Sequence, residues 1–255
     1  MKPIIVLKIG TSTLTGGTEN VSRGKIEDIS VQLKELKKTY DIILVSSGAI
    51  AVAKQFYKLR TSEDSTSIKS ALSAIGQPKL MQIYQETFSD NGLHVAQCLL
   101  TDYDLKGNDS RKNTKATITD LLKFDYIPII NENDTVAVDE ILLGDNDKLS
   151  ALVAELMNAE KLVIASDIDG IFSGNPKLNP DAKLIEKVSS IDEIKTYVQD
   201  FDNGLGTGGM QSKIHALEIC NGKGIEVLIV NGGIQFFLRK ALNGVIKFTS
   251  FQGKK

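Results

Sequence analysis

The sequence has few of the residues from which disulfide frameworks and metal centres are built. Among its 255 residues there are two cysteines, two histidines and no tryptophan. Cys98 and Cys220 do not form a CxxC pair, which argues against a zinc site and fits a reducing compartment such as the cytoplasm. His94 and His215 are too few for a histidine-based metal centre. We therefore expect a cytoplasmic protein that holds no metal ion through its own side chains.

Long apolar runs and an excess of one charge are also missing. No segment approaches the ~18 apolar residues of a membrane-spanning helix, and Lys8 interrupts the apolar start, so we expect no signal peptide. The 30 Lys and Arg residues nearly balance 32 Asp and Glu residues, which weighs against nucleic acid as a partner. A length of 255 residues allows one large α/β domain or two lobes.

Short apolar runs alternate with segments of helical periodicity along the chain. This alternation predicts a mostly parallel sheet with right-handed crossovers. Strands are expected at residues 3–9, 41–45, 93–100, 126–130, 161–165, 227–230 and 245–249. Helices are expected at residues 22–38, 49–59, 68–88, 109–123, 146–157, 191–198 and 211–221, the third of them broken near Gly76 and Pro78.

Residues 126–155 carry a dense group of carboxylates directly after a predicted strand. Ligands bind at the carboxyl ends of strands in an open α/β sheet, and such a group is costly unless a cation is brought to it. We expect this acidic loop to receive an amino group and to organise distant lysines. Its acidic residues are Glu132, Asp134, Asp139, Glu140, Asp145 and Asp147.

Two lysines stand at positions from which they could bind a phosphate. Lys8 stands near the end of the first strand, two residues before Gly10. It is explained by a side chain that snorkels to solvent, by an edge strand, or by a cation directed at phosphate. Small residues at 46–50 place free N–H groups at a helix N-terminus, as an anion site or as ordinary capping. Residues 204–209 read G-x-G-x-x-G but follow a polar segment, which excludes a dinucleotide fingerprint. With Lys213 they form either a phosphate cradle or a flexible loop beside a surface lysine.

Together these features predict phosphoryl transfer, which depends on positioning and on neutralising spread negative charge. Lys8 and Lys213 would flank the transferred group, and Asp147 would hold both ammonium groups. Mg²⁺ would be held mainly by the phosphates of ATP. Asp145 and Asp147 resemble part of a calcium loop, but the glycine and glutamate that such a loop requires are missing.

The motifs resemble the amino acid kinase family, and more narrowly its glutamate-phosphorylating branch at the start of proline biosynthesis. They are residues 8–12 (KIGTS), 46–50 (SSGAI), 131–136 (NENDTV), 144–147 (GDND) and 206–210 (GTGGM) with Lys213. The resemblance implies an open αβα sandwich and transfer of the ATP γ-phosphoryl group to the γ-carboxylate of L-glutamate. The implied catalytic residues are Lys8, Lys213 and Asp147. The implied glutamate-binding residues are Ser47, Gly48, Asp134, Asp145 and Asn146. The implied ATP-binding residues are Lys8, Gly10, Ser166, Asp167, Thr207, Gly208, Gly209, Met210, Gln211, Ser212 and Lys213.

The resemblance carries further expectations. An amino-acid-binding lobe would span about residues 1–158 and a nucleotide-binding lobe about residues 159–255, without the PUA domain that many relatives append. A homo-oligomer, feedback inhibition by proline and contact with a glutamate-5-phosphate reductase are implied in the same way. Two alternatives stay open: a kinase of this fold for another small carboxylate, and a non-catalytic sensor of amino acid or nucleotide.

Overall fold

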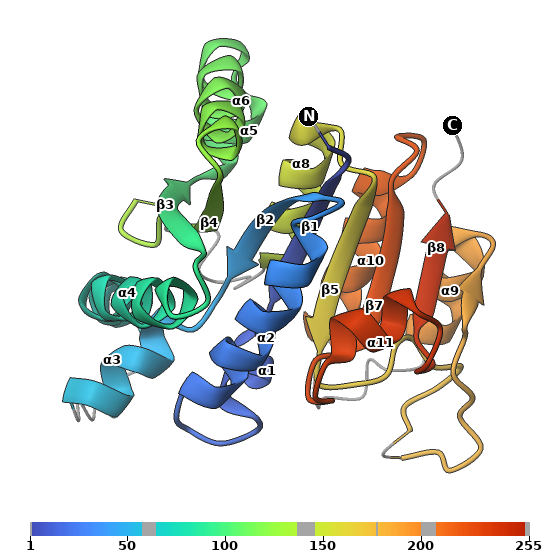
Figure 1. The fold of residues 1–255 in the computed structure, drawn as a ribbon. Coiled ribbons are helices and arrows are strands. Elements are labelled where there is room, and N and C mark those ends of the chain that lie inside the picture. Colours follow the sequence, from blue (N-terminus) through green and yellow to red (C-terminus); the bar gives the residue numbers. More distant parts are fainter. Residues whose placement is uncertain (1, 58–64, 137–145, 177, 200–207, 253–255) are drawn as a thin grey trace.

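The computed structural model describes residues 2–57, 65–136, 146–176, 178–199 and 208–252, and its centre is one eight-stranded sheet (Figure 1). The strand order is β3-β4-β2-β1-β5-β7-β8-β6, and only the β7–β8 pair is antiparallel among the paired strands of the described residues. The prediction of a mostly parallel sheet is confirmed. The strands are β1 (Ile4–Ile9), β2 (Asp41–Ser46), β3 (His94–Leu100), β4 (Tyr126–Glu132), β5 (Lys161–Ser166), β6 (Lys187–Val188), β7 (Glu226–Asn231) and β8 (Thr249–Gln252).

Helices cover both faces of the sheet, each over its own hydrophobic cluster, so the αβα sandwich is confirmed. One face carries α5 (Asp102–Lys106), α6 (Asn108–Lys123), α8 (Asn146–Met157), α9 (Ile191–Gln199) and α10 (Gly208–Cys220). The other face carries α1 (Thr11–Thr15), α2 (Arg23–Leu36), α3 (Ala49–Tyr57), α4 (Thr66–Ser89) and α11 (Phe237–Leu242). No helix among these described elements is both long enough and apolar enough to cross a membrane.

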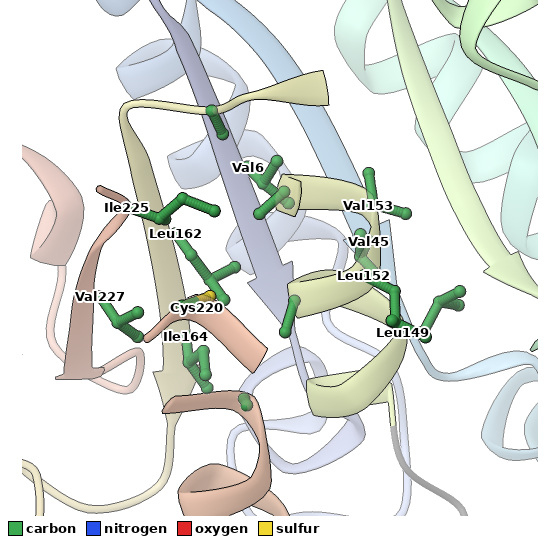
Figure 2. Close-up of a cluster of buried hydrophobic side chains, with 14 of the residues drawn as sticks. Val6, Val45, Leu149, Leu152, Val153, Leu162, Ile164, Cys220, Ile225 and Val227 are labelled. Atoms are coloured by element: carbon green, nitrogen blue, oxygen red, sulfur yellow. The ribbon is translucent and has the colours of Figure 1, made fainter. Parts of the chain in front are cut away.

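Strand β1 lies in the middle of the sheet, between β2 and β5. Its side chains alternate between the two clusters: Ile5 and Leu7 pack toward α2 and α4, and Val6 packs toward α8 (Figure 2). Because successive side chains of a strand point to opposite faces, Lys8 shares the face of Val6 and points toward α8 and α10. The edge-strand explanation of Lys8 is therefore wrong.

Helix α4 runs unbroken through Pro78, so the predicted break is wrong. Proline removes one backbone donor, and packing against α3 holds the helix together across this defect. Gly76 makes that packing possible, since a Cβ atom there would lie 1.9 Å from the carbonyl oxygen of Ala49. The glycine therefore serves close approach between two helices rather than a break.

The last predicted strand is also wrong in place. The strand forms at Thr249–Gln252, and residues 245–248 precede it. The backbone N–H of Val245 donates to the carbonyl of Lys240 (2.8 Å), and Gly244 adopts φ +66°. Together they close the C-terminal end of α11, so Val245 is unavailable to a sheet ladder. Helices α1, α5 and α11 were not predicted; two of them are only five residues long.

Candidate active site

The predicted site residues gather at the carboxyl edge of the parallel strands. Lys8 is the second-to-last residue of β1, Ser47 follows β2, and Ser166 ends β5. Asn146 and Asp147 open α8, which packs across β1. Parallel strands bring their carboxyl ends to one edge, so residues more than a hundred positions apart meet there.

Asp147 stands between the two predicted lysines. Its Oδ1 lies 2.5 Å from Lys8 Nζ and its Oδ2 lies 3.2 Å from Lys213 Nζ. The side chains are 2%, 12% and 10% exposed for Asp147, Lys8 and Lys213, so the three charges are largely screened from water. Burial raises the pKa of Asp147, but the two lysines outweigh burial and hold its pKa below the ordinary value. Two ammonium groups and one carboxylate give the cluster a formal charge of +1.

The first turn of α10 shapes the Lys213 side of this cluster. Lys213 Nζ donates to the carbonyl of Gly209 (2.8 Å), which confirms that the lysine leans back toward the helix N-terminus. Ser212 Oγ lies 3.0 Å from Asp147 Oδ2 and 3.1 Å from the Gly209 carbonyl oxygen, and its single hydrogen can be donated to either. Met210 is buried in the hydrophobic core and Gln211 is exposed. The side chain of Met210 is thus part of the core, and only its backbone could face a phosphate.

Two glycines open the backbone near the cluster. A Cβ atom at Gly10 would lie 3.4 Å from Lys8 Nζ, so glycine leaves the ammonium group uncovered. Gly48 adopts φ +109°, and a Cβ atom there would lie 3.0 Å from Leu14. This backbone conformation is available at low cost only to glycine, and it places Ser47 just before the N-terminus of α3.

A chain of side-chain amides runs from Ser47 into the protein. Asn146 Nδ2 donates to Ser47 Oγ (2.7 Å) and to Asn131 Oδ1 (2.9 Å). Asn131 Nδ2 donates to Gln77 Oε1 (2.9 Å), and Gln77 Nε2 donates to Gln97 Oε1 (3.1 Å). Asn146, Asn131 and Gln77 are all buried. The amides therefore form a fixed network rather than a solvated loop.

Asp134 belongs to the same side of the site. It accepts a hydrogen bond from Ser73 of α4. Burial raises the pKa of Asp134, and the Ser73 hydrogen bond only partly offsets this. A half-buried carboxylate of this kind gains from a cationic partner.

Ser166 ends β5 and Asp167 follows it, beside the loop after β7. Ser166 Oγ donates to Asp167 Oδ1 (3.3 Å), and the Ser166 carbonyl accepts from Gly232 (2.8 Å). Lys25 Nζ donates to the Gly232 carbonyl (2.7 Å) and pairs with Asp28 at 3.7 Å. Burial lowers the pKa of Lys25 in spite of that pair. The loop at Gly232 is thus fixed to α2 by the hydrogen bond from Lys25.

Sequence reasoning missed three residues that support the site: Lys25, Ser73 and Gln77. Two of them sit on α4 four positions apart, on the helix face that meets Asn131 and Asp134. The available signal was the polar residue between Gly76 and Pro78, which was interpreted as part of a helix break.

Asp139, Glu140, Asp145, Thr207 and the glycines before it lie outside the described residues, as does the C-terminal tail. Within the described part of the chain, no group of three or more His, Cys, Asp or Glu side chains is arranged to hold a metal ion.

Comparison with known proteins places the chain among kinases. Residues 3–231 match the model of the amino acid kinase family. The chain is 40% identical over 253 residues to "Glutamate 5-kinase" of Sodalis glossinidius (strain morsitans), covering 98% of this chain and 69% of that protein. It is 42% identical over 250 residues to "Glutamate 5-kinase 2" of Pseudoalteromonas translucida (strain TAC 125), covering 97% of this chain and 68% of that protein.

Solved structures agree on the fold. UMP kinase from Ureaplasma parvum superposes with a TM-score of 0.68 at 17% identity, covering 99% of both chains. Carbamate kinase from Giardia lamblia bound to AMP-PNP gives a TM-score of 0.68 at 18% identity, again covering 99% of both chains. The fold predicted from the motifs is the fold of these structures.

Proposed function

The chain belongs to the amino acid kinase family, and from that membership and the geometry of its charge cluster we propose that it transfers the γ-phosphoryl group of ATP to the γ-carboxylate of L-glutamate. The product is L-glutamyl 5-phosphate, the first intermediate of proline biosynthesis. Relatives about 40% identical over nearly the whole chain carry the name of this activity.

One observation supports the chemistry most strongly: two largely buried lysines, from β1 and α10, are held by a single carboxylate. In phosphoryl transfer, negative charge spreads over the transferred group and catalysis consists of positioning and neutralising it. Lys8 and Lys213 provide two ammonium groups at one point. Asp147 keeps both in place and keeps their mutual repulsion small. A protein that only sensed ligands would not need this arrangement.

In the proposed reaction, one oxygen of the γ-carboxylate forms a bond to the γ-phosphorus of ATP. The bond from that phosphorus to the β–γ bridging oxygen breaks, and ADP leaves with the electron pair. No proton transfer is needed at the acceptor, because a carboxylate is already ionised at neutral pH. The chain's own part is to orient the two reactants and to stabilise charge.

The acceptor would lie on the Ser47 side of the cluster. The free N–H groups at the start of α3 suit a carboxylate, and the carboxylate of Asp134 and the amide oxygen of Asn146 suit an ammonium group. Asp145 would contribute near the ammonium. This places a zwitterionic amino acid with one carboxylate directed toward Lys8.

ATP would lie on the Gly209 side, over the first turn of α10 and the Ser166–Asp167 end of β5, with Gly10 allowing close approach of phosphate. Mg²⁺ would come with the phosphates, since both oxygens of Asp147 are engaged by lysines. We propose on this basis that residues 1–158 mainly bind the amino acid and residues 159–255 mainly bind the nucleotide. The cytoplasmic location, homo-oligomer, proline inhibition and reductase contact stay predictions.

The test is an assay that depends on ATP and Mg²⁺ and traps the acyl phosphate with hydroxylamine. L-Glutamate is run beside L-aspartate, N-acetylglutamate and carbamate. Hydroxamate from free glutamate alone is expected, because N-acetylglutamate and carbamate lack the ammonium group that the acidic side chains attract and the side chain of aspartate is one methylene shorter. Turnover only with another acceptor would overturn the substrate assignment. ATP binding without any turnover would favour the sensor.

A further inference from the structure

The amide chain behind Ser47 has a direction that a backbone group imposes. The N–H of Glu132 donates to the Asn131 side chain at 2.9 Å. A backbone N–H can only donate, so the Asn131 atom that it meets must be Oδ1. The opposite atom of that amide is then Nδ2, which needs an acceptor, and Gln77 Oε1 supplies it at 2.9 Å.

The direction passes on to Asn146. Because Asn131 Oδ1 accepts, the Asn146 atom facing it at 2.9 Å must be Nδ2, and the same Nδ2 reaches Ser47 Oγ at 2.7 Å. Both hydrogens of Nδ2 are thus used inside the protein. Oδ1, which can only accept, is the part of this amide that can meet a ligand.

Gln77 is placed to maintain this state. It is 6% exposed and sits on α4, one turn after Ser73. Gly76, the residue before it, packs α4 closely against Ala49 of α3, and Gln77 itself reaches Asn131 near the end of β4. Without an acceptor at position 77, the buried Nδ2 of Asn131 is left unsatisfied. The Glu132 N–H still disfavours a flip of the amide in place, so the Asn131 side chain rotates toward another partner for Nδ2, and Asn146 loses the contact that fixes the orientation of its amide.

We propose that Gln77 is a positioning residue. By accepting a hydrogen bond from Asn131 it keeps the side-chain oxygen of Asn146 directed toward the substrate. In this way it sets the preference for a substrate that carries an ammonium group. This inference rests on the proposed function. A reversed Asn146 amide would present N–H groups to the substrate ammonium, and two donors repel. The affinity for a compound without an ammonium group would not change when the Asn146 amide is reversed.

The test compares Gln77→Met, Gln77→Glu and Gln97→Met with wild type. Methionine keeps the length of the side chain and removes the acceptor, whereas glutamate keeps the acceptor. Gln97→Met is the matched control, because it removes the next amide of the chain and leaves Gln77 Oε1 in place. For each protein the KM for L-glutamate and the Ki for glutarate are measured. Glutarate keeps both carboxylates and lacks the ammonium group.

Gln77→Met is expected to raise the KM for glutamate about tenfold, as for the loss of one buried hydrogen bond, and to leave the Ki for glutarate within about twofold. Gln77→Glu and Gln97→Met are expected to stay within about threefold of wild type for both constants. An unchanged KM in Gln77→Met overturns the proposal. A parallel rise of KM and Ki also overturns it, because general damage to the pocket would affect both compounds alike.

A second measurement needs no substrate and so separates this inference from the proposed function. The side-chain NH₂ resonances of Asn146 are assigned by their loss in Asn146→Asp. Their exchange with solvent is expected to be slow in wild type and Gln77→Glu and at least about tenfold faster in Gln77→Met. Equal exchange in wild type and Gln77→Met overturns the proposal even if the enzyme uses glutamate. Lack of turnover with glutamate, together with the expected exchange pattern, would count against the proposed function alone.

Discussion

Replacing Asp147 by asparagine removes the charge that holds the two lysines and changes little in size. In the wild type the Asp147 carboxylate lies 2.5 Å from Lys8 Nζ and 3.2 Å from Lys213 Nζ. In the variant the two ammonium groups repel each other without this compensating charge. Asparagine can still accept a hydrogen bond from Ser212. The variant therefore isolates the charge of Asp147 from its shape.

The expected loss in free energy of unfolding follows from burial. Breaking a buried ion pair costs about 3–5 kcal/mol because a charge is left without compensation. The two lysine side chains keep 12% and 10% of their exposure, which lets water reach them. We expect the lower end of that range, about 3 kcal/mol near pH 7. Turnover is expected to fall at least about 100-fold, as for loss of charge stabilisation in a transition state.

A more exposed arrangement of the same composition gives the matched control. Asp102 also pairs with two lysines, Lys106 and Lys148, the latter at 3.2 Å. Lys106 is 59% exposed, so this group is worth at most about 1 kcal/mol. Urea unfolding of Asp147→Asn and Asp102→Asn beside wild type measures both losses. Equal losses in the two variants would refute the reasoning from burial.

The pH dependence has a definite sign. The pKa of Asp147 is lower in the folded state than in the unfolded chain, so its contribution to stability is present above the unfolded value of about 3.9 and disappears as the pH falls through the folded value. The stability difference between wild type and Asp147→Asn should therefore be constant above about pH 5 and shrink at lower pH. A difference that grows on acidification would contradict the ion-pair account.

Three further predictions test other parts of the structure. Lys213→Met should lower turnover about 100- to 1000-fold with native circular dichroism; turnover near wild type would remove this lysine from the mechanism. Asp134→Asn should raise the KM for glutamate. Because burial raises the pKa of Asp134, the wild-type KM should rise toward the variant's value as the pH falls; a ratio of the two KM values that does not change with pH would count against this role. Gly76→Ala should destabilise the fold by at least about 2 kcal/mol in urea unfolding, because its Cβ would meet the Ala49 carbonyl. Gly24→Ala, at an exposed helix position with no Cβ contact nearer than 3.8 Å, is the control, and equal effects would contradict the packing argument.

The framework of the fold was predictable because most of its strands are short apolar runs that alternate with segments of helical periodicity. The run that became β1 and the periodic segment Asn146–Met157 were both recognised. The short helices α1 and α5 were not, since five residues carry no periodicity. The last strand was misplaced because Val245 has the β-branched side chain typical of strands but is held by the C-terminal end of α11. That contact depends on tertiary context.

The charged centre of the site was also predictable. Lys8, Asp147 and Lys213 each stand at a position that strand-end or helix-start rules mark, and the structure brings all three together. The supporting residues Ser73 and Gln77 carry no such mark, because their role depends on which face of α4 meets the end of β4. Gly76 was interpreted as a helix break, whereas in the structure it allows α4 to pack closely against Ala49. A glycine within a helical segment is compatible with a break or with close helix packing, and the sequence alone does not distinguish the two.

The proposed reaction is tested most directly by following the oxygen atoms of the acceptor. L-Glutamate labelled with ¹⁸O in both γ-carboxylate oxygens is incubated with ATP, Mg²⁺ and the protein, and the product is cleaved with hydroxylamine. Hydroxylamine attacks the carbonyl carbon, so the released phosphate keeps the oxygen that joined carbon to phosphorus. Mass spectrometry of that phosphate should find one ¹⁸O atom in each molecule. Phosphate without ¹⁸O would show that water, and not the γ-carboxylate, receives the phosphoryl group, and would contradict the proposal.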